Sequence, residues 1–289
     1  MSGGGSGASE PAPVVLPGTA RFDLTGAEGG PGWRIFVAVP DTPPPEAGYP
    51  SLLMLDANAG FASFAETARR AGVRPRATGI GPVLIVGVGY PTEAPHDRER
   101  RRFDFTAGPA REAAPPGREV GPTGGSAAFL AFLLDRLRPA IAARWRLDPA
   151  RAALFGHSLG GAFVLEAFAR APRAFSHHIA VSPSIWWDEP HLLAGLAARD
   201  RTAPARLALM IGEYEEALAP WQQGRAGSAE IAERRARRAM VTTLHRFAQA
   251  ARRELGPQAR IVSEVLAGED HASVLAPAMS RALRFLSAD

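Results

Sequence analysis

Residues 154–161 read Leu154-Phe155-Gly156-His157-Ser158-Leu159-Gly160-Gly161, and they join a short apolar run to a helix-like segment. Within this stretch, Gly156 to Gly160 fits the pattern G-x-S-x-G. A serine on so sharp a turn has strained backbone geometry, and side chains at the flanking positions would clash with the strand or the helix. The pattern therefore predicts a nucleophile elbow that exposes the Ser158 hydroxyl at a helix N-terminus, where negative charge is favoured. The alternative is a glycine-rich turn with an incidental serine.

Continuous apolar runs alternate with helical patterns after about residue 50. The runs that we interpret as strands are 52–55, 83–89, 152–155, 178–182, 207–211 and 261–266. Such runs are typical of a mostly parallel central sheet that is covered by helices on both faces. Residues 21–24 and 33–40 read as two further strands joined by a Gly-rich turn at 26–32, which predicts an N-terminal antiparallel hairpin.

The covering helices are predicted from apolar residues at helical spacing. They are expected over 61–71, 126–143 (interrupted by Pro139), 162–170, 191–198, 231–255 and 274–286. Residues 91–125 read as a long irregular stretch, and loops of this length in a compact domain are usually functional or disordered. Residues 1–18 are rich in Gly, Ser, Ala and Pro and are expected to be a disordered tail, with a single domain over 19–289.

The composition argues against several classes of site and partner. The chain of 289 residues has no cysteine, which excludes disulfides, thiolate zinc sites and a cysteine nucleophile. All 33 basic residues are arginines, and they are scattered instead of forming a stripe with aromatic residues, so nucleic-acid binding has little support. No apolar run reaches the roughly 18–20 residues of a membrane span, and the start of the chain lacks the features of a secretory signal. We therefore expect a cytoplasmic protein.

A serine nucleophile needs a base and, usually, a carboxylate that orients the base. In a parallel sheet such groups collect at the carboxyl ends of strands. His271 follows the last predicted strand and is the candidate base for Ser158, because histidine titrates near neutral pH. Glu213 follows the preceding strand and is the candidate acid. Glu215 or Glu216 could take its place, and a Ser–His dyad without an acid also stays open.

The oxyanion hole needs two backbone N–H groups that point at the oxygen of the tetrahedral intermediate. One candidate is Leu159, the residue after the nucleophile. The other is Ala57 or Asn58, in the loop after an earlier predicted strand. The alternative for Asp56-Ala57-Asn58 is an ordinary Asx turn that ends the strand.

Two further segments are narrower than the serine elbow, which is shared by a whole superfamily. They are Arg101-Arg102-Phe103-Asp104-Phe105-Thr106 and Ser182-Pro183-Ser184-Ile185-Trp186-Trp187. Together with the elbow and Gly268-Glu269-Asp270-His271, they resemble the esterase branch of the α/β hydrolases that includes the enterobactin and salmochelin trilactone esterases. The resemblance extends from about Phe22 over nearly the whole chain.

This resemblance implies an α/β-hydrolase fold, with Ser158 as nucleophile and His271 as base. It also implies that Arg101 or Arg102 faces the substrate, and that Trp186 and Trp187 line the pocket near the elbow. The alternative for the two arginines is a surface ion pair with Asp104 or Glu99. The family usually has glycine at the positions of Ala57 and Ala272.

The expected function is that of a serine esterase that hydrolyses carboxylic esters through an acyl-enzyme. The candidate substrates are a siderophore ester of the trilactone type and simpler acyl esters. No metal or organic cofactor is implied, and the expected partner is a small-molecule ester. Two alternatives remain: an acyltransferase that uses the same Ser–His machinery, and a ligand-binding protein that keeps the fold without turnover. The sequence leaves the oligomeric state open.

Overall fold

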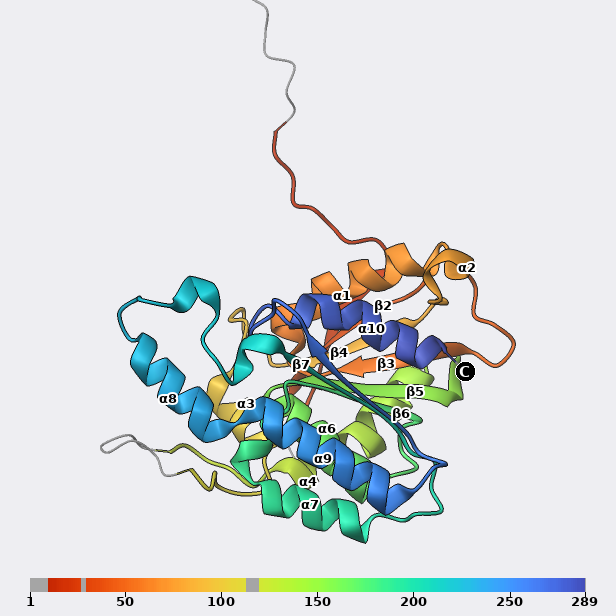
Figure 1. Cartoon of the computed structure of the whole chain (residues 1–289). Coiled ribbons are helices and arrows are strands. Elements are labelled where there is room, and N and C mark those ends of the chain that lie inside the picture. Colours follow the sequence, from red (N-terminus) through yellow and green to blue (C-terminus); the bar gives the residue numbers. More distant parts are fainter. Residues whose placement is uncertain (1–9, 27–29, 113–119, 289) are drawn as a thin grey trace, which may run out of the picture.

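The computed structural model describes residues 10–26, 30–112 and 120–288, and its centre is one eight-stranded sheet (Figure 1). The first nine residues of the expected tail, and part of the expected turn at 26–32, lie outside the described residues. The strands are β1 Thr19–Leu24, β2 Trp33–Ala38, β3 Tyr49–Met54, β4 Leu84–Gly89, β5 Leu147–His157, β6 His177–Val181, β7 Arg206–Gly212 and β8 Arg260–Leu266.

The strand order is β1-β2-β4-β3-β5-β6-β7-β8. β1 pairs antiparallel with β2, and β2 pairs antiparallel with β4, whereas every later pairing is parallel. The prediction of a mostly parallel sheet with an N-terminal antiparallel hairpin is confirmed. The crossovers that parallel pairing requires are supplied by the helices between the strands.

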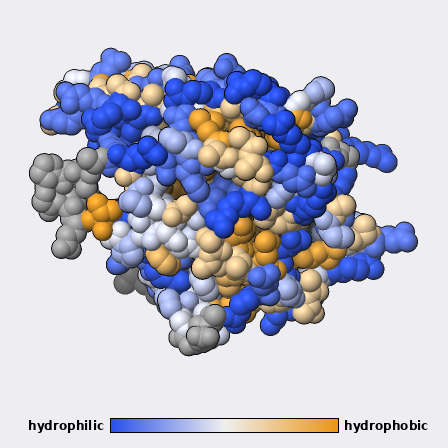
Figure 2. Space-filling model, turned by 90° about the horizontal axis from the view of Figure 1, so that it is seen from below, coloured by the Kyte–Doolittle hydropathy of each residue, from blue (hydrophilic) through white to orange (hydrophobic). Residues whose placement is uncertain are grey.

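Helices cover both faces of the sheet, as the periodicity predicts. α1 Ala57–Gly72 and α10 Leu275–Ser287 lie on one face, while α4 Ser126–Phe132, α6 Leu159–Arg170, α7 Glu189–Ala198 and α9 Met240–Leu255 lie on the other (Figure 1). Two apolar clusters result, because side chains alternate along a strand. Leu52 packs in the cluster that includes Phe64 of α1, and its neighbour Leu53 packs in the cluster that includes Phe163 of α6. In Figure 2, which shows the second helix layer from outside, hydrophilic and hydrophobic residues are interspersed.

Helical structure continues past the expected interruption at Pro139. α4 runs into a π-helical turn, η2 Leu133–Leu137, and then into α5 Arg138–Ala142. A proline within a helix lacks an N–H donor, and its ring clashes with the carbonyl four residues earlier. The wider π turn precedes the proline, and such turns are a known way for a helix to absorb a local irregularity.

The helix predicted over 231–255 is two helices, and this part of the prediction is wrong. α8 Ser228–Arg238 and α9 are separated at Ala239, which has the left-handed backbone angles φ 42° and ψ 51°. Residues such as Leu244 and Phe247 bury one face of α9 against the sheet, whereas no residue of α8 is buried. The apolar face of the predicted helix therefore ends at Ala239, and the chain turns away so that α8 leaves the main body (Figure 1).

The stretch 91–125 is not entirely irregular, because it contains α3 Arg98–Asp104. Asp97 begins this helix, and its side chain accepts a hydrogen bond from the Arg100 N–H at 3.0 Å. One further short helix, α2 Pro75–Thr78, follows α1. Short 3-10 turns are found at η3 Ile185–Trp187, η4 Glu213–Glu215 and η5 Pro220–Gln222.

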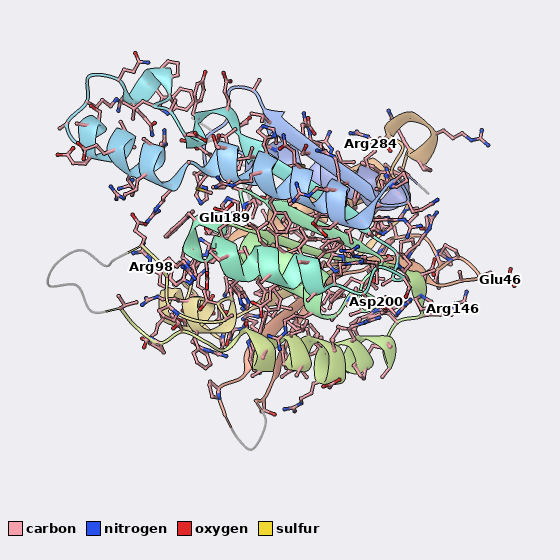
Figure 3. All side chains as sticks on the ribbon, turned by 60° about the horizontal axis from the view of Figure 1, so that its bottom comes forward. Glu46, Arg98, Arg146, Glu189, Asp200 and Arg284 are labelled. Carbon is pink, nitrogen blue, oxygen red and sulfur yellow. The ribbon has the colours of Figure 1, made fainter. Side chains whose placement is uncertain are left out.

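The carboxyl ends of the parallel strands meet at one end of the molecule. Figure 3 labels Arg98 and Glu189 at that end, close to α8, and Glu46 and Arg146 at the opposite end. Among the described residues, no helix combines the length and apolar character needed to cross a membrane.

Candidate active site

The elbow lies between β5 and α6 and holds Ser158 in an unusual conformation, with φ 60° and ψ −120°. A Cβ at Gly156 would lie 2.3 Å from the carbonyl oxygen of Gly160, and a Cβ at Gly161 would lie 2.9 Å from Cα of Pro183. A Cβ at Gly160, in contrast, would meet its nearest neighbour at an ordinary 3.6 Å. The turn therefore requires glycine at 156 and 161, and less strictly at 160.

His271 has a ring nitrogen within hydrogen-bond distance of the serine hydroxyl. Its Nε2 lies 3.1 Å from Oγ of Ser158, within hydrogen-bond distance. His157 supports the loop, because its Nε2 lies 2.9 Å from the carbonyl oxygen of His271 and donates to it. Burial lowers the pKa of His157 to about 3, so this second ring stays neutral. Asp270 caps its own turn by accepting hydrogen bonds from two backbone N–H groups and does not contact the His271 ring.

Glu215 is the carboxylate that meets the other ring nitrogen of His271. Its Oε2 lies 2.5 Å from Nδ1, while Oε1 accepts hydrogen bonds from the Gly212 N–H at 2.8 Å and from the Ser182 hydroxyl. The residue is 2% exposed. Burial acts to raise the pKa of Glu215, but the hydrogen bonds and the charge of His271 outweigh it, and the pKa lies below its ordinary value. Glu215 is therefore ionised at neutral pH.

The structure does not place the expected acid, Glu213, against His271. Glu213 is exposed, and its Oε2 accepts a hydrogen bond from the Gly268 N–H at 2.7 Å. Glu216 accepts hydrogen bonds from the N–H and hydroxyl of Thr242, each at 2.8 Å. The reason is local: the chain forms the 3-10 turn η4 directly after β7, so the third residue of the turn, not the first, points back under His271.

The two backbone N–H groups expected to form the oxyanion hole have no hydrogen-bond acceptor among the described residues. Leu159 begins α6 and Ala57 begins α1, and neither N–H donates to another of the described residues. The Ala57 methyl group faces β4, where the absence of a side chain at Gly87 makes room for it. Asn58 has a different task, because its side chain bonds to Tyr90 N–H, Tyr90 C=O and Thr92 C=O.

Arg101 is held by a carboxylate next to Ala57 and does not reach Ser158. Its Nε lies 2.9 Å from Oδ1 of Asp56, and its Nη2 lies 2.6 Å from Oδ2. Asp56 has left-handed backbone angles, φ 55° and ψ 41°, so the bidentate pair fixes a strained residue directly before Ala57. Burial acts to lower the pKa of Arg101, but Asp56 raises it above its ordinary value. The carboxylate that pairs with Arg101 is thus Asp56, and not Asp104 or Glu99, the partners in the alternative interpretation. The Arg102 guanidinium lies against Gly121, outside the Ser158 cavity.

The two tryptophans separate. Trp186 lines the cavity that contains Ser158 and His271, whereas Trp187 lies in a neighbouring cavity and donates its Nε1–H to the Gly108 carbonyl at 2.9 Å. Of the two tryptophans expected near the elbow, the structure places Trp186 alone in the lining of the Ser158 cavity.

The Ser158 cavity has a volume of about 170 Å³. One wall of this cavity is formed by arginines of α8, which the sequence analysis did not place at the site. Arg234, Arg235 and Arg238 of α8 line it together with Met240. These arginines lie 76 to 80 residues after Ser158 in sequence, on a segment that reads as an ordinary charged helix. Within the described ranges, no group of three or more His, Cys, Asp or Glu side chains could hold a metal ion.

The chain is similar to several proteins that are described as siderophore esterases. The chain is 36% identical over 279 residues to the ferri-bacillibactin esterase BesA of Bacillus subtilis, covering 94% of this chain and 90% of that protein. It is 33% identical to the siderophore enterobactin esterase of Emericella nidulans, covering 94% and 96% of the two chains. The structure of the BES protein from Bacillus cereus superposes with a TM-score of 0.83 at 29% identity, covering 96% of this chain and 99% of that one.

The family model for Esterase matches residues 30–258, which is most of the chain. The resemblance noted from the sequence motifs is thereby confirmed, as is the α/β-hydrolase fold. The chain is a member of the Esterase family, together with the siderophore esterases to which it is similar.

Proposed function

We propose that this protein is a serine esterase that hydrolyses carboxylic esters through an acyl-enzyme, with Ser158, His271 and Glu215 as its catalytic triad. The observation that carries the proposal is the chain of hydrogen-bond contacts from Ser158 Oγ through both ring nitrogens of His271 to Glu215, with distances of 3.1 Å and 2.5 Å. This arrangement gives each residue the role that acyl transfer needs.

The proposed reaction begins when Nε2 of His271 takes the Ser158 hydroxyl proton and Oγ attacks the ester carbonyl carbon. The N–H groups of Leu159 and Ala57 then stabilise the negative oxygen of the tetrahedral intermediate. Glu215 stabilises the imidazolium that forms. His271 passes its proton to the leaving alcohol, the ester C–O bond breaks, and a water molecule activated by the same histidine hydrolyses the acyl-enzyme.

We further propose that the substrates are esters of siderophores. The similarity to a ferri-bacillibactin esterase and a siderophore enterobactin esterase over 94% of the chain supports this substrate class.

The alternative without turnover is a ligand-binding protein, in which Ser158, His271 and Glu215 would take no part in a reaction. The hydrogen-bonded, buried Glu215 argues against that alternative, because a buried carboxylate that had no task would be a costly feature to keep.

The test is covalent labelling with an organophosphonate probe, followed by peptide mass spectrometry. Wild-type protein should be labelled at Ser158 and lose its activity towards a nitrophenyl ester in proportion to the labelling. The Ser158→Ala variant should be neither labelled nor active, with an unfolding temperature close to that of the wild type. Labelling at another serine, or full activity of Ser158→Ala, would show that the proposed mechanism is wrong.

A further inference from the structure

The wall of the Ser158 cavity that α8 forms carries an excess of positive charge. Arg234, Arg235 and Arg238 line this wall. Among the described residues that line the cavity, the one carboxylate is Glu215, which is paired with His271. We propose that α8 is a specificity element that selects ester substrates carrying negative charge outside the scissile bond. This inference rests on the proposed esterase function and names the residues that narrow its substrate range.

Arg235 is fixed in place by neutral groups. Its Nη1 donates to the Ala217 carbonyl at 2.6 Å and to Oε1 of Gln222 at 2.8 Å. Neither acceptor carries a formal charge. The charge of Arg235 also helps to lower the pKa of Asp270, but among the described residues no ion pair joins the two. An oriented cation without a direct carboxylate partner is well placed at a cavity wall to attract an anionic group, since little reorganisation is needed when the group arrives.

Arg238 also points its charge at the cavity, although it has a carboxylate neighbour. Its guanidinium lies 3.6 Å from the ring centre of Trp186, and its Nε lies 2.9 Å from Oε2 of Glu112. The same carboxylate pairs with Arg237 at 2.9 Å, so one negative charge is shared by two positive ones. The cation–π contact with Trp186 holds the Arg238 guanidinium in the cavity lining that also contains Ser158.

Arg234 is the least restrained of the three. Its side chain is exposed at the cavity, and none of the described residues accepts a hydrogen bond from it or forms an ion pair with it. A ligand can therefore pair with the Arg234 guanidinium without breaking a hydrogen bond or ion pair within the described part of the protein. This makes Arg234 the residue whose replacement changes charge with the smallest effect on the fold.

The size of the cavity indicates where the anionic part of a substrate lies. Its volume of about 170 Å³ is below the roughly 300–1,000 Å³ of pockets that enclose a small molecule. A large substrate can insert only the part that carries the scissile ester, and the remainder must lie over the rim, which α8 forms. A large ester that carries anionic groups away from the scissile bond fits this description, because exposed arginines attract negative charge within about one Debye length.

The experiment compares two ester probes that differ in one charge. They are 4-acetoxybenzenesulfonate and the neutral 4-acetoxybenzenesulfonamide, which share the acyl group and have similar leaving groups. For wild-type protein we expect a larger kcat/KM for the sulfonate. In Arg234→Gln, the ratio of the two kcat/KM values should fall about five- to tenfold, and further in Arg234→Glu, whereas Arg234→Lys should keep most of it.

Arg225→Gln is the matched control, because it removes one exposed positive charge from the segment just before α8 at a side chain that does not line the cavity. Its ratio should equal that of the wild type. Raising the ionic strength to about 0.5 M should lower the wild-type ratio towards that of Arg234→Gln. Using a ratio guards against folding defects, since these lower both rates together.

Equal ratios in the wild type, Arg234→Gln and Arg234→Glu would overturn the role of α8. Labelling of Ser158 is an independent measurement, so the esterase proposal would stand if Ser158 were still labelled. Conversely, absence of Ser158 labelling would overturn the esterase proposal itself.

Discussion

Replacing Glu215 by glutamine tests which of the three neighbouring glutamates, Glu213, Glu215 or Glu216, is the partner of His271. Glutamine has nearly the same size, and its oxygen can still accept the Gly212 N–H, which Oε1 of Glu215 accepts at 2.8 Å. What the variant loses is the negative charge 2.5 Å from Nδ1 of His271. During Oγ attack, the ring becomes an imidazolium, and this cation would then have no counter-charge.

The size of the effect follows from the attraction between the two charges. Two unit charges about 4 Å apart interact by about 4 kcal/mol at an effective dielectric constant near 20. At about 1.4 kcal/mol per factor of ten, this corresponds to a fall in kcat of about 10³-fold, and the wrong ring tautomer can extend the loss to about 10⁴-fold. We expect KM to change little, because the imidazolium exists only after the substrate has bound.

The assay is the initial rate of nitrophenyl ester hydrolysis at pH 8, with thermal unfolding to show that each variant is folded. Glu213→Gln and Glu216→Gln are the matched controls and should keep kcat within about threefold of the wild type, because both carboxylates are engaged by groups other than His271. If Glu215→Gln stayed within tenfold of the wild type while Glu213→Gln lost 10³-fold, the assignment from the structure would be refuted.

Three further predictions concern the supports of the site. Gly156→Ala should lower the free energy of unfolding by about 3 kcal/mol in urea titrations, because the new methyl group would lie 2.3 Å from a carbonyl oxygen. Gly160→Ala should change the free energy of unfolding by under about 1 kcal/mol, and similar values for both variants would contradict the steric argument. Arg101→Met should lower kcat about 10- to 100-fold with KM little changed, because Asp56 would no longer be held next to the proposed oxyanion hole. Arg101→Lys should restore only part of the rate, and a rise in KM alone would instead indicate a substrate contact. Burial lowers the pKa of His178 to about 3, so the folded state keeps this ring neutral, while the unfolded chain takes up a proton below about pH 6.5. The free energy of unfolding should therefore fall by up to about 1.4 kcal/mol per pH unit on acidification from about pH 6.5 towards pH 3, and His178→Leu should show a shallower slope in denaturant titrations between these limits.

The features that could be predicted from the sequence are those that depend on neighbouring residues or on repeated patterns. Continuous apolar runs predicted the buried strands, because a strand covered on both faces must be apolar throughout. The elbow was visible because the close approach at Gly156 admits no side chain. His271 could be singled out since it follows the last strand, and the carboxyl ends of parallel strands meet at one edge.

The features that could not be predicted depend on how the backbone turns between elements. Glu213 and Glu215 are two residues apart, and the choice between them depends on the 3-10 turn after β7, for which the sequence holds no clear signal. Arg101 was expected at the substrate, yet it pairs with Asp56, a residue 45 positions earlier in the chain. No local pattern records such a contact.

The amino-acid sequence by itself determined the layered α/β fold, the position of the serine elbow and the identity of the histidine that could serve it. These follow from periodicity and from steric limits within a few residues. Only the tertiary structure decided that Glu215 meets His271, that Arg101 supports Ala57 and that the arginines of α8 face Ser158. Each of those contacts joins residues brought together by the packing of separate elements, and a side chain's partner across such an interface is set by backbone direction, not by its neighbours in sequence.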